Sequence, residues 1–228
     1  MSIKAVVFDL DDTLYPEIDY VKSGFYEVGK EIEKRFGVKN AFNKLYKYFL
    51  HNKNNVYGRV LRDFGVAFKE SDIFDLVKIY RTHIPKLSLT DEVKNTILSL
   101  RKQVLKIGII TDGRPFQQYA KIQALGLDKI VDTIIVTDGL GGIEYRKPNP
   151  TAFKKMCKIL CIQPEEMVYV GDNPKKDFAI KKYLSIKTVM VKSGLYQQEN
   201  YLYDIQPDVI IDYLFELLNV ELNAIRGC

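Results

Sequence analysis

The chain has 228 residues, of which 46% are hydrophobic and 28% are charged, and its formal net charge is +5. This composition is typical of a globular protein with one sizeable core, or with one domain that carries a smaller insertion. The basic residues are spread along the chain, which argues against nucleic-acid binding, and no apolar run approaches membrane-spanning length. The first predicted strand begins at once, so we expect no signal peptide.

Histidine and cysteine are too scarce for several common kinds of site. His51 and His83 are the only histidines, so a histidine-based metal centre or a Ser-His-Asp triad is nearly excluded. Any metal would then be a hard cation held by oxygen ligands. Cys157, Cys161 and Cys228 make no disulfide framework, and the spacing of the first two predicts that both are core thiols. This usage is consistent with a reducing cytoplasm, where we expect the protein to act.

The first predicted element is a buried strand in the apolar stretch that begins at Ala5. It ends in three carboxylates within four residues, those of Asp9, Asp11 and Asp12. A continuously apolar strand is typical of a parallel sheet covered on both faces, and in such sheets ligands bind beyond the carboxyl ends of the strands. Two carboxylates about 4 Å apart repel by roughly 4 kcal/mol at an effective dielectric near 20. The stretch therefore predicts a positively charged partner, with Asp12 expected to play a supporting role.

Residues from about 21 to 86 predict four amphipathic helices and no strand. Apolar stripes at helical spacing cover 25–36, 42–49, 60–64 and 73–80, with Gly37 and Gly65 after the first and the third. Four helices between one strand and the next are more than a simple crossover needs. We therefore predict a small helical domain over 20–86, inserted into a domain that consists of 1–19 and 87–228.

The rest of the chain alternates strands with helices. Strands are predicted at 104–111, within 130–136, and at 167–170, 188–191 and 209–211. Helices are predicted over 91–100, from Pro115 to Gly126, over 153–161 and after 211. This alternation indicates an α/β fold with a doubly wound parallel sheet.

Polar residues follow three of these strands, and parallel strands would bring them to one edge of the sheet. Asp9 and Asp172, with a nearby backbone carbonyl, would form an oxygen-only pocket that suits Mg²⁺. Thr111 and the N–H groups of Asp112 and Gly113 would bind phosphate oxygens at a turn that leads into a helix. The pattern therefore predicts a site for a metal ion and a phosphoryl group.

Lys147, in a loop flanked by prolines, would add a second positive charge to this edge. A carboxylate beside a phosphoryl group is a competent nucleophile, and an acid two residues later can protonate the leaving oxygen and then activate water. Because alternate residues of a strand point the same way, Asp9 and Asp11 are expected to face one substrate.

The sequence resembles the haloacid dehalogenase superfamily, which carries Asp-x-Asp-x-Thr, then a Thr or Ser, a Lys and Gly-Asp-x-x-x-x-Asp. The matching residues occur in the same order: Asp9, Asp11, Thr13, Thr111, Lys147, Asp172 and Asp177. The match spans the predicted α/β domain, and 20–86 resembles the helical cap that some members insert after the first strand. Each motif is short, but four in order are a specific signal.

The resemblance implies a role for each residue. Asp9 would be the nucleophile, Asp11 the general acid and base, and Thr111 and Lys147 would hold the phosphoryl group. Dehalogenases and phosphonate-cleaving members lack an acid at the position of Asp11. The resemblance therefore implies hydrolysis of a phosphate ester, or phosphoryl transfer between hydroxyls.

The resemblance also implies a Mg²⁺ site formed by Asp9, the carbonyl of Asp11 and Asp172. Asp177 is either an alternative ligand or an acid that supports the site without touching the metal.

We predict a Mg²⁺-dependent phosphatase that hydrolyses a small-molecule phosphate monoester, a sugar phosphate or a nucleotide, through an aspartyl-phosphate. A sugar phosphomutase and a non-catalytic phosphometabolite-binding module are the alternatives. The phosphate-binding residues would be Thr111, Asp112, Gly113, Arg114 and Lys147. Further candidates for substrate recognition are Tyr15, Lys22, Tyr57, Arg59, Arg62 and Gln117.

Overall fold

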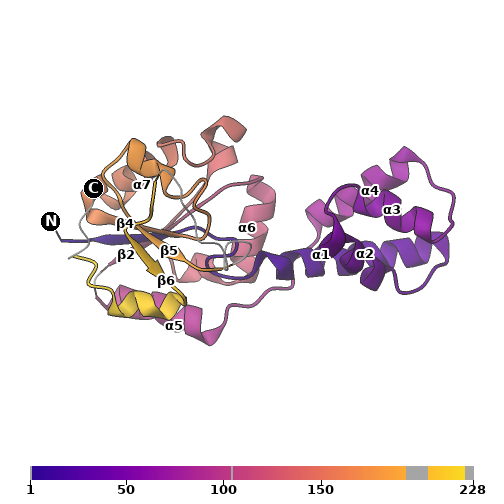
Figure 1. Ribbon diagram of the computed structural model, residues 1–228, viewed down its shortest axis with the longest axis horizontal. Helices are drawn as coiled ribbons and strands as arrows, with labels where there is room; N and C mark the ends of the chain where they lie inside the picture. Colours follow the sequence, from indigo (N-terminus) through magenta and orange to yellow (C-terminus); the bar gives the residue numbers. More distant parts are fainter. Residues whose placement is uncertain (1, 104, 194–204, 224–228) are drawn as a thin grey trace. The chain divides into compact units, whose positions relative to one another are not determined.

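The computed structural model describes residues 2–103, 105–193 and 205–223 (Figure 1). The chain divides into two compact units. The larger unit consists of Met1–Glu17 and Ser88–Cys228, and the smaller one is Ile18–Leu87.

Among the described residues, the larger unit contains a six-stranded parallel sheet in the order β3-β2-β1-β4-β5-β6. Both faces of β1 and β4 are buried, which explains why these strands read as unbroken apolar runs. The predicted α/β fold with a parallel sheet is confirmed. The strands are β1 (Ala5–Phe8), β2 (Lys106–Thr111), β3 (Thr133–Val136), β4 (Met167–Gly171), β5 (Lys187–Val191) and β6 (Val209–Ile211).

Helices cover both faces of this sheet, with α7 (Thr151–Leu160) and α5 (Asp91–Lys102) on opposite sides (Figure 1). Phe153 of α7 packs edge-on against Tyr169 of β4 at a centroid distance of 4.9 Å. Gly108 of β2 leaves room for the side chain of Met156 of α7, since a Cβ there would lie 2.8 Å from its sulfur. The helix α6 (Pro115–Ala124) follows β2 and begins with a proline, whose missing N–H is not needed in a first turn.

The smaller unit is described throughout and consists of the helices α1 (Glu17–Phe36), α2 (Ala41–His51), α3 (Val56–Asp63) and α4 (Glu70–Thr82). Its apolar stripes meet in one core that includes Val28, Leu45, Leu61 and Leu76. Gly37 and Gly65 both have a φ of +68°, a conformation that favours glycine after a helix.

Two of the recognition candidates have partners within the helical unit. Lys22 forms an ion pair with Asp19, with 3.2 Å between Nζ and Oδ1. Arg59 donates to the carbonyl oxygens of Tyr48 and Asn52. The contacts of Arg59 therefore serve the packing of α2 and α3, and a role of Lys22, Tyr57, Arg59 or Arg62 in recognition stays a prediction.

The expectation of two core thiols is correct for Cys157 and wrong for Cys161. Cys157 is buried, whereas Cys161 is exposed. Cys161 is the residue after α7, in a left-handed conformation with a φ of 55°, so its side chain no longer follows the buried face of the helix. Cys228 lies outside the described residues.

The predicted C-terminal helix is a short 3₁₀ helix over Leu214–Asn219. No helix in the described part of the chain is both long and apolar enough to cross a membrane.

Candidate active site

The adjacent strands β1, β2 and β4 bring three polar chain segments to one edge of the sheet. Phe8 ends β1 and pairs with Ile109 on one side and Val170 on the other. The N–H of Asp9 then donates to the carbonyl of Val170 at 2.8 Å, so Asp9 lies directly beside the end of β4. Thr111 is the last residue of β2. The parallel register therefore places Asp9, Thr111 and the segment after Gly171 together.

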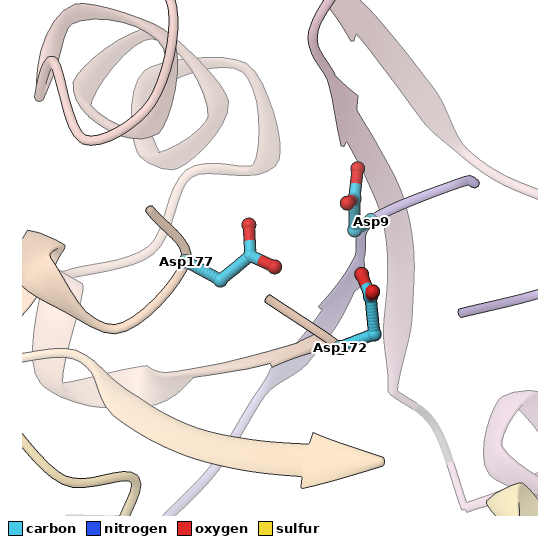
Figure 2. Close-up of side chains that lie close together, drawn as sticks. All are labelled: Asp9, Asp172 and Asp177. Atoms are coloured by element: carbon cyan, nitrogen blue, oxygen red, sulfur yellow. The ribbon is translucent and has the colours of Figure 1, made fainter. Parts of the chain in front are cut away.

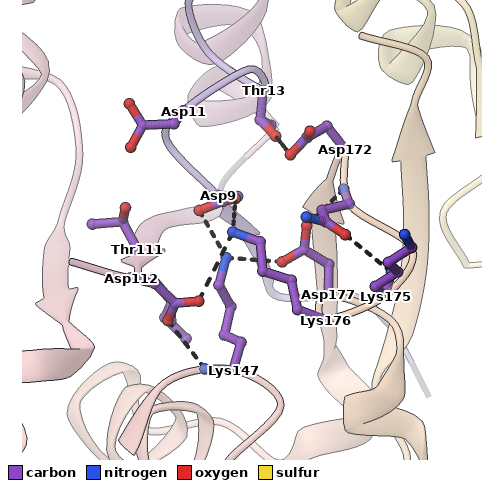
Figure 3. Close-up of polar contacts among 12 residues, drawn as sticks. Asp9, Asp11, Thr13, Thr111, Asp112, Lys147, Asp172, Lys175, Lys176 and Asp177 are labelled. Carbon is purple, nitrogen blue, oxygen red and sulfur yellow. Dashed lines mark hydrogen bonds and ion pairs between the residues drawn. The ribbon is translucent and has the colours of Figure 1, made fainter. Parts of the chain in front are cut away.

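Lys147 is the central cation of this site (Figure 3). Its side chain is fully buried, with Nζ 2.7 Å from Oδ1 of Asp9 and 2.8 Å from Oδ1 of Asp177. Nζ also donates to the hydroxyl of Tyr169 at 2.7 Å. Burial by itself would lower the pKa of Lys147, but the negative charges of Asp177 and Asp9 outweigh burial and raise that pKa. Lys147 is therefore charged throughout the neutral range.

The loop that carries Lys147 is anchored to the end of β2 through Asp112. The backbone N–H of Lys147 donates to Oδ1 of Asp112 at 3.0 Å, and the hydroxyl of Thr137 donates to the same oxygen at 2.9 Å. The side chain of Asp112 thus holds two loops in place. Phosphate binding by the N–H groups of Asp112 and Gly113 stays a prediction.

Asp9, Asp172 and Asp177 form a buried acidic cluster (Figure 2). One carboxylate oxygen of each lies within 4.8 Å of those of the other two. Burial would raise the pKa of Asp9, but Lys147 and then Lys176 outweigh it and hold this pKa below 3.8. Burial, with the nearby charges of Asp9 and Asp177, raises the pKa of Asp172 to about 8. The charge of Lys176 offsets this rise only in part, and a divalent cation would supply further positive charge.

Asp177 belongs to the cluster but is held by the protein. It is fully buried, it is paired with Lys147, and its Oδ2 accepts from the N–H of Asn173 at 2.9 Å. These contacts use its oxygens to hold Lys147 and the turn after β4. They favour the supporting role over direct metal binding for Asp177.

Asp11 lies outside this cluster and is held by other side chains. The strand β1 ends at Phe8, so the alternation of a strand does not determine where Asp11 points. Its carboxylate accepts from Lys121 and Gln118 of α6 and from Tyr15.

The other two residues of the first motif take part in the turn after β1. The hydroxyl of Thr13 lies 3.5 Å from Oδ1 of Asp172, in line with a donated hydrogen bond. Asp12, in a left-handed conformation, accepts from the N–H of Glu17 at 2.8 Å. Both side chains shape the turn that carries Asp11.

Lys176 is a second cation of the site that the sequence analysis missed. Its Nζ lies 3.4 Å from Oδ2 of Asp9 and 3.8 Å from Oδ2 of Asp112 (Figure 3). Its position in the turn between Asp172 and Asp177 was the available signal. Tyr169 carried no such signal, because a tyrosine inside an apolar strand reads as core.

Arg114 was predicted to bind phosphate, and the structure places it at the surface near Asp138. Hydrogen bonds from Arg146, at 2.6 and 2.7 Å, are the main reason why the pKa of Asp138 is lowered, and the charge of Arg114 contributes less. The charge of Arg114 thus acts on the acid of a neighbouring loop, and its phosphate-binding role stays a prediction.

Comparison with known proteins identifies the same family as the motif residues that the site brings together. Residues 6–191 match the model of a family described as haloacid dehalogenase-like hydrolase. The chain is 32% identical to the glyceraldehyde 3-phosphate phosphatase of Pyrococcus furiosus over 96% of this chain and 92% of that protein. It is 28% identical to the pyrophosphatase PpaX of Bacillus cereus over 100% of both chains.

Among solved structures, the HAD-hydrolase YfnB of Bacillus subtilis, crystallised with magnesium, has a similar fold. The TM-score is 0.72 at 19% identity, and the superposition covers 96% of this chain and 98% of that chain.

Proposed function

Because the chain belongs to the haloacid dehalogenase-like hydrolase family, we propose that it is a Mg²⁺-dependent phosphatase of a small phosphate monoester, acting through an aspartyl-phosphate at Asp9. The observation that carries this proposal is the buried pair of Asp9 and Lys147 beside Asp172. Lys147 and Lys176 keep Asp9 ionised, as a nucleophile must be, and hold positive charge where a phosphoryl group would approach.

In the first step, an oxygen of Asp9 attacks the phosphorus atom and the bond from phosphorus to the ester oxygen breaks. The electron pair of that bond stays on the ester oxygen, which takes a proton from the carboxyl group of Asp11 and leaves as an alcohol. Lys147 and Thr111 hold the phosphoryl oxygens during this transfer.

In the second step, a water oxygen attacks the phosphorus atom of the aspartyl-phosphate while Asp11 takes a proton from that water. The bond from phosphorus to Asp9 breaks, its electron pair returns to the carboxylate, and inorganic phosphate is released. Asp11 is protonated again, so the enzyme has returned to its starting state.

The donors at the site fit a magnesium ion, because the cluster offers only oxygen ligands and includes an acid, Asp172, whose charge Lys176 compensates only in part. Asp9, Asp172 and the carbonyl of Asp11 would hold the ion. When bound, Mg²⁺ neutralises charge on the phosphoryl oxygens and so favours attack by an anionic carboxylate.

The curated relatives support a small substrate. The Pyrococcus protein is named for hydrolysis of glyceraldehyde 3-phosphate, so we propose a sugar phosphate of similar size as the first substrate to test. We also propose that the helical unit Ile18–Leu87 is the cap that selects this substrate, and that the enzyme works in the cytoplasm without a nucleic-acid partner.

A phosphate-release assay with a panel of sugar phosphates and nucleoside monophosphates tests the function. We expect steady release from at least one triose or other small sugar phosphate, full dependence on added Mg²⁺ and loss of activity in EDTA. If the assay yields isomerised sugar phosphate without free phosphate, the protein is a phosphomutase and not a phosphatase. Calorimetric binding without turnover across the panel would point to a binding module.

Gly171 gives a sharp test of the site geometry. A Cβ at this position would lie 2.5 Å from Oδ2 and 2.8 Å from Cγ of Asp177, closer than real Cβ atoms come. We expect Gly171→Ala to displace Asp177 from Lys147 and to lower kcat at least about tenfold, because small misplacements of reacting groups are costly. Gly139→Ala is the matched control, since its Cβ would make an ordinary contact at 3.4 Å. Equal kcat values for the two variants would contradict this view of Asp177.

A further inference from the structure

The carboxylate of Asp11 is held by three side chains outside the recognised motifs. Nζ of Lys121 lies 2.8 Å from Oδ1 and 2.9 Å from Oδ2. Nε2 of Gln118 donates to Oδ2 at 2.9 Å, and the hydroxyl of Tyr15 donates to Oδ1 at 2.5 Å. Each oxygen of Asp11 thus accepts two contacts, so this arrangement is that of the ionised carboxylate, and one contact must give way when the group carries the proton for the leaving oxygen.

The two α6 side chains are buried as deeply as core residues. Lys121 is 4% exposed and Gln118 is 3% exposed. Removing a lysine from water is unfavourable. Replacing a buried ion pair by well-packed apolar side chains often leaves the stability of a protein unchanged or raises it. An apolar residue would serve packing alone at least as well. The presence of Lys121 at this position therefore points to the carboxylate it holds.

The same helix connects Asp11 with the predicted phosphoryl-binding residue Thr111. Gln118 and Lys121 are three residues apart and so lie on one face of α6. The second N–H of the Gln118 amide donates to the hydroxyl oxygen of Thr111 at 2.6 Å. Because α6 begins just after the turn that follows Thr111, one rigid element carries the groups that hold both residues (Figure 3 shows Asp11 and Thr111).

We propose that Lys121 and Gln118 are positioning residues that hold the carboxyl group of Asp11 in place for proton transfer to the leaving oxygen. This inference rests on the proposed phosphatase function and assigns that function two further residues. Neither side chain reacts, since each acts through its contact with Asp11. The consequence is specific: loss of Lys121 slows the reaction only where the leaving group needs a proton, whereas loss of Gln118 also removes its contact with Thr111 and adds a loss common to all leaving groups.

Two probe substrates separate this role from a general structural one. Glycerol phosphate releases an alkoxide, which must be protonated as it leaves, whereas p-nitrophenyl phosphate releases a phenolate that leaves as an anion. The quantity kcat/KM reports the steps up to loss of the leaving group, so it isolates this proton transfer from the later hydrolysis of the aspartyl-phosphate.

We expect Lys121→Met to lower kcat/KM for glycerol phosphate at least about tenfold and to change that for p-nitrophenyl phosphate less than about threefold. Gln118→Met keeps the ion pair of Lys121 with Asp11 but loses the contact with Thr111, so we expect a loss common to both substrates and, in the ratio of the two kcat/KM values, a smaller shift in the same direction. Lys121→Arg should restore part of the glycerol phosphate activity, because arginine can donate to both carboxylate oxygens. The matched control is Lys129→Met, at an exposed lysine shortly after α6.

Equal losses with both substrates would overturn the proposal, as would variants that behave like the wild type. If Lys121→Met does not fold, the ratio of the two kcat/KM values in Gln118→Met decides by the same criterion. A wild-type protein that releases phosphate from neither probe and from no member of the sugar-phosphate and nucleotide panel would instead overturn the proposed function. The two failures are therefore distinguishable.

Discussion

Replacing Asp9 by asparagine should abolish phosphate release. Asp9 is 1% exposed and lies against Lys147 and Lys176, and the amide of asparagine has nearly the same shape but no anionic oxygen to attack phosphorus. We expect kcat with p-nitrophenyl phosphate to fall at least about a thousandfold, as is usual when a covalent nucleophile is removed. The wild type should also yield acid-stable labelled protein when it is quenched during turnover with labelled substrate, and Asp9→Asn should not.

Asp12→Asn is the matched control for this experiment. It is the same chemical change three residues away, at a position whose φ of 56° asparagine tolerates. The side chain of Asp12 accepts a hydrogen bond from the N–H of Glu17, outside the acidic cluster. We expect its kcat to stay within a few-fold of the wild-type value. If Asp9→Asn kept more than a tenth of the wild-type activity, Asp9 would not be the nucleophile.

Replacing Lys147 by methionine should cost both stability and activity. Methionine nearly fills the same volume, but it leaves the buried carboxylates of Asp9 and Asp177 without the cation that lies 2.7 and 2.8 Å away. Removing one partner of a buried ion pair typically lowers the free energy of unfolding by about 3–5 kcal/mol. Urea denaturation at pH 7 in EDTA measures this loss. Lys155→Met, at an exposed lysine of α7, should change it by less than about 0.5 kcal/mol.

The difference between wild type and Lys147→Met should depend on pH. In the wild type, the pKa of Asp9 lies below 3.8, so its stabilising charge is present above pH 3.8 and is lost as the pH falls further through the folded-state value. Lys147, with its raised pKa, stays charged throughout this range. The difference should therefore be largest near neutral pH and should shrink at acidic pH. A difference that grows on acidification would contradict the ion pair.

Much of the architecture is determined by the sequence alone. Unbroken apolar runs such as that of β1 require burial on both faces, which is typical of a parallel sheet covered by helices on both sides. Since the carboxyl ends of parallel strands share one edge, the order of the strand-end residues was enough to predict that Asp9, Thr111 and Asp172 lie together. The four helices between Glu17 and Thr82 followed from apolar stripes and from glycines at helix ends.

Other properties were decided only by the tertiary structure, because they depend on which side chains meet from distant segments. The pKa of Asp172 is set by its burial and by the charges of Asp9 and Asp177, and no local pattern reports that sum. Gln118 and Lys121 look like ordinary polar residues of an amphipathic helix, and only the packing of α6 turns them toward Asp11. The sequence thus determined where the reactive groups are, whereas the packing determined what holds them and in which charge state.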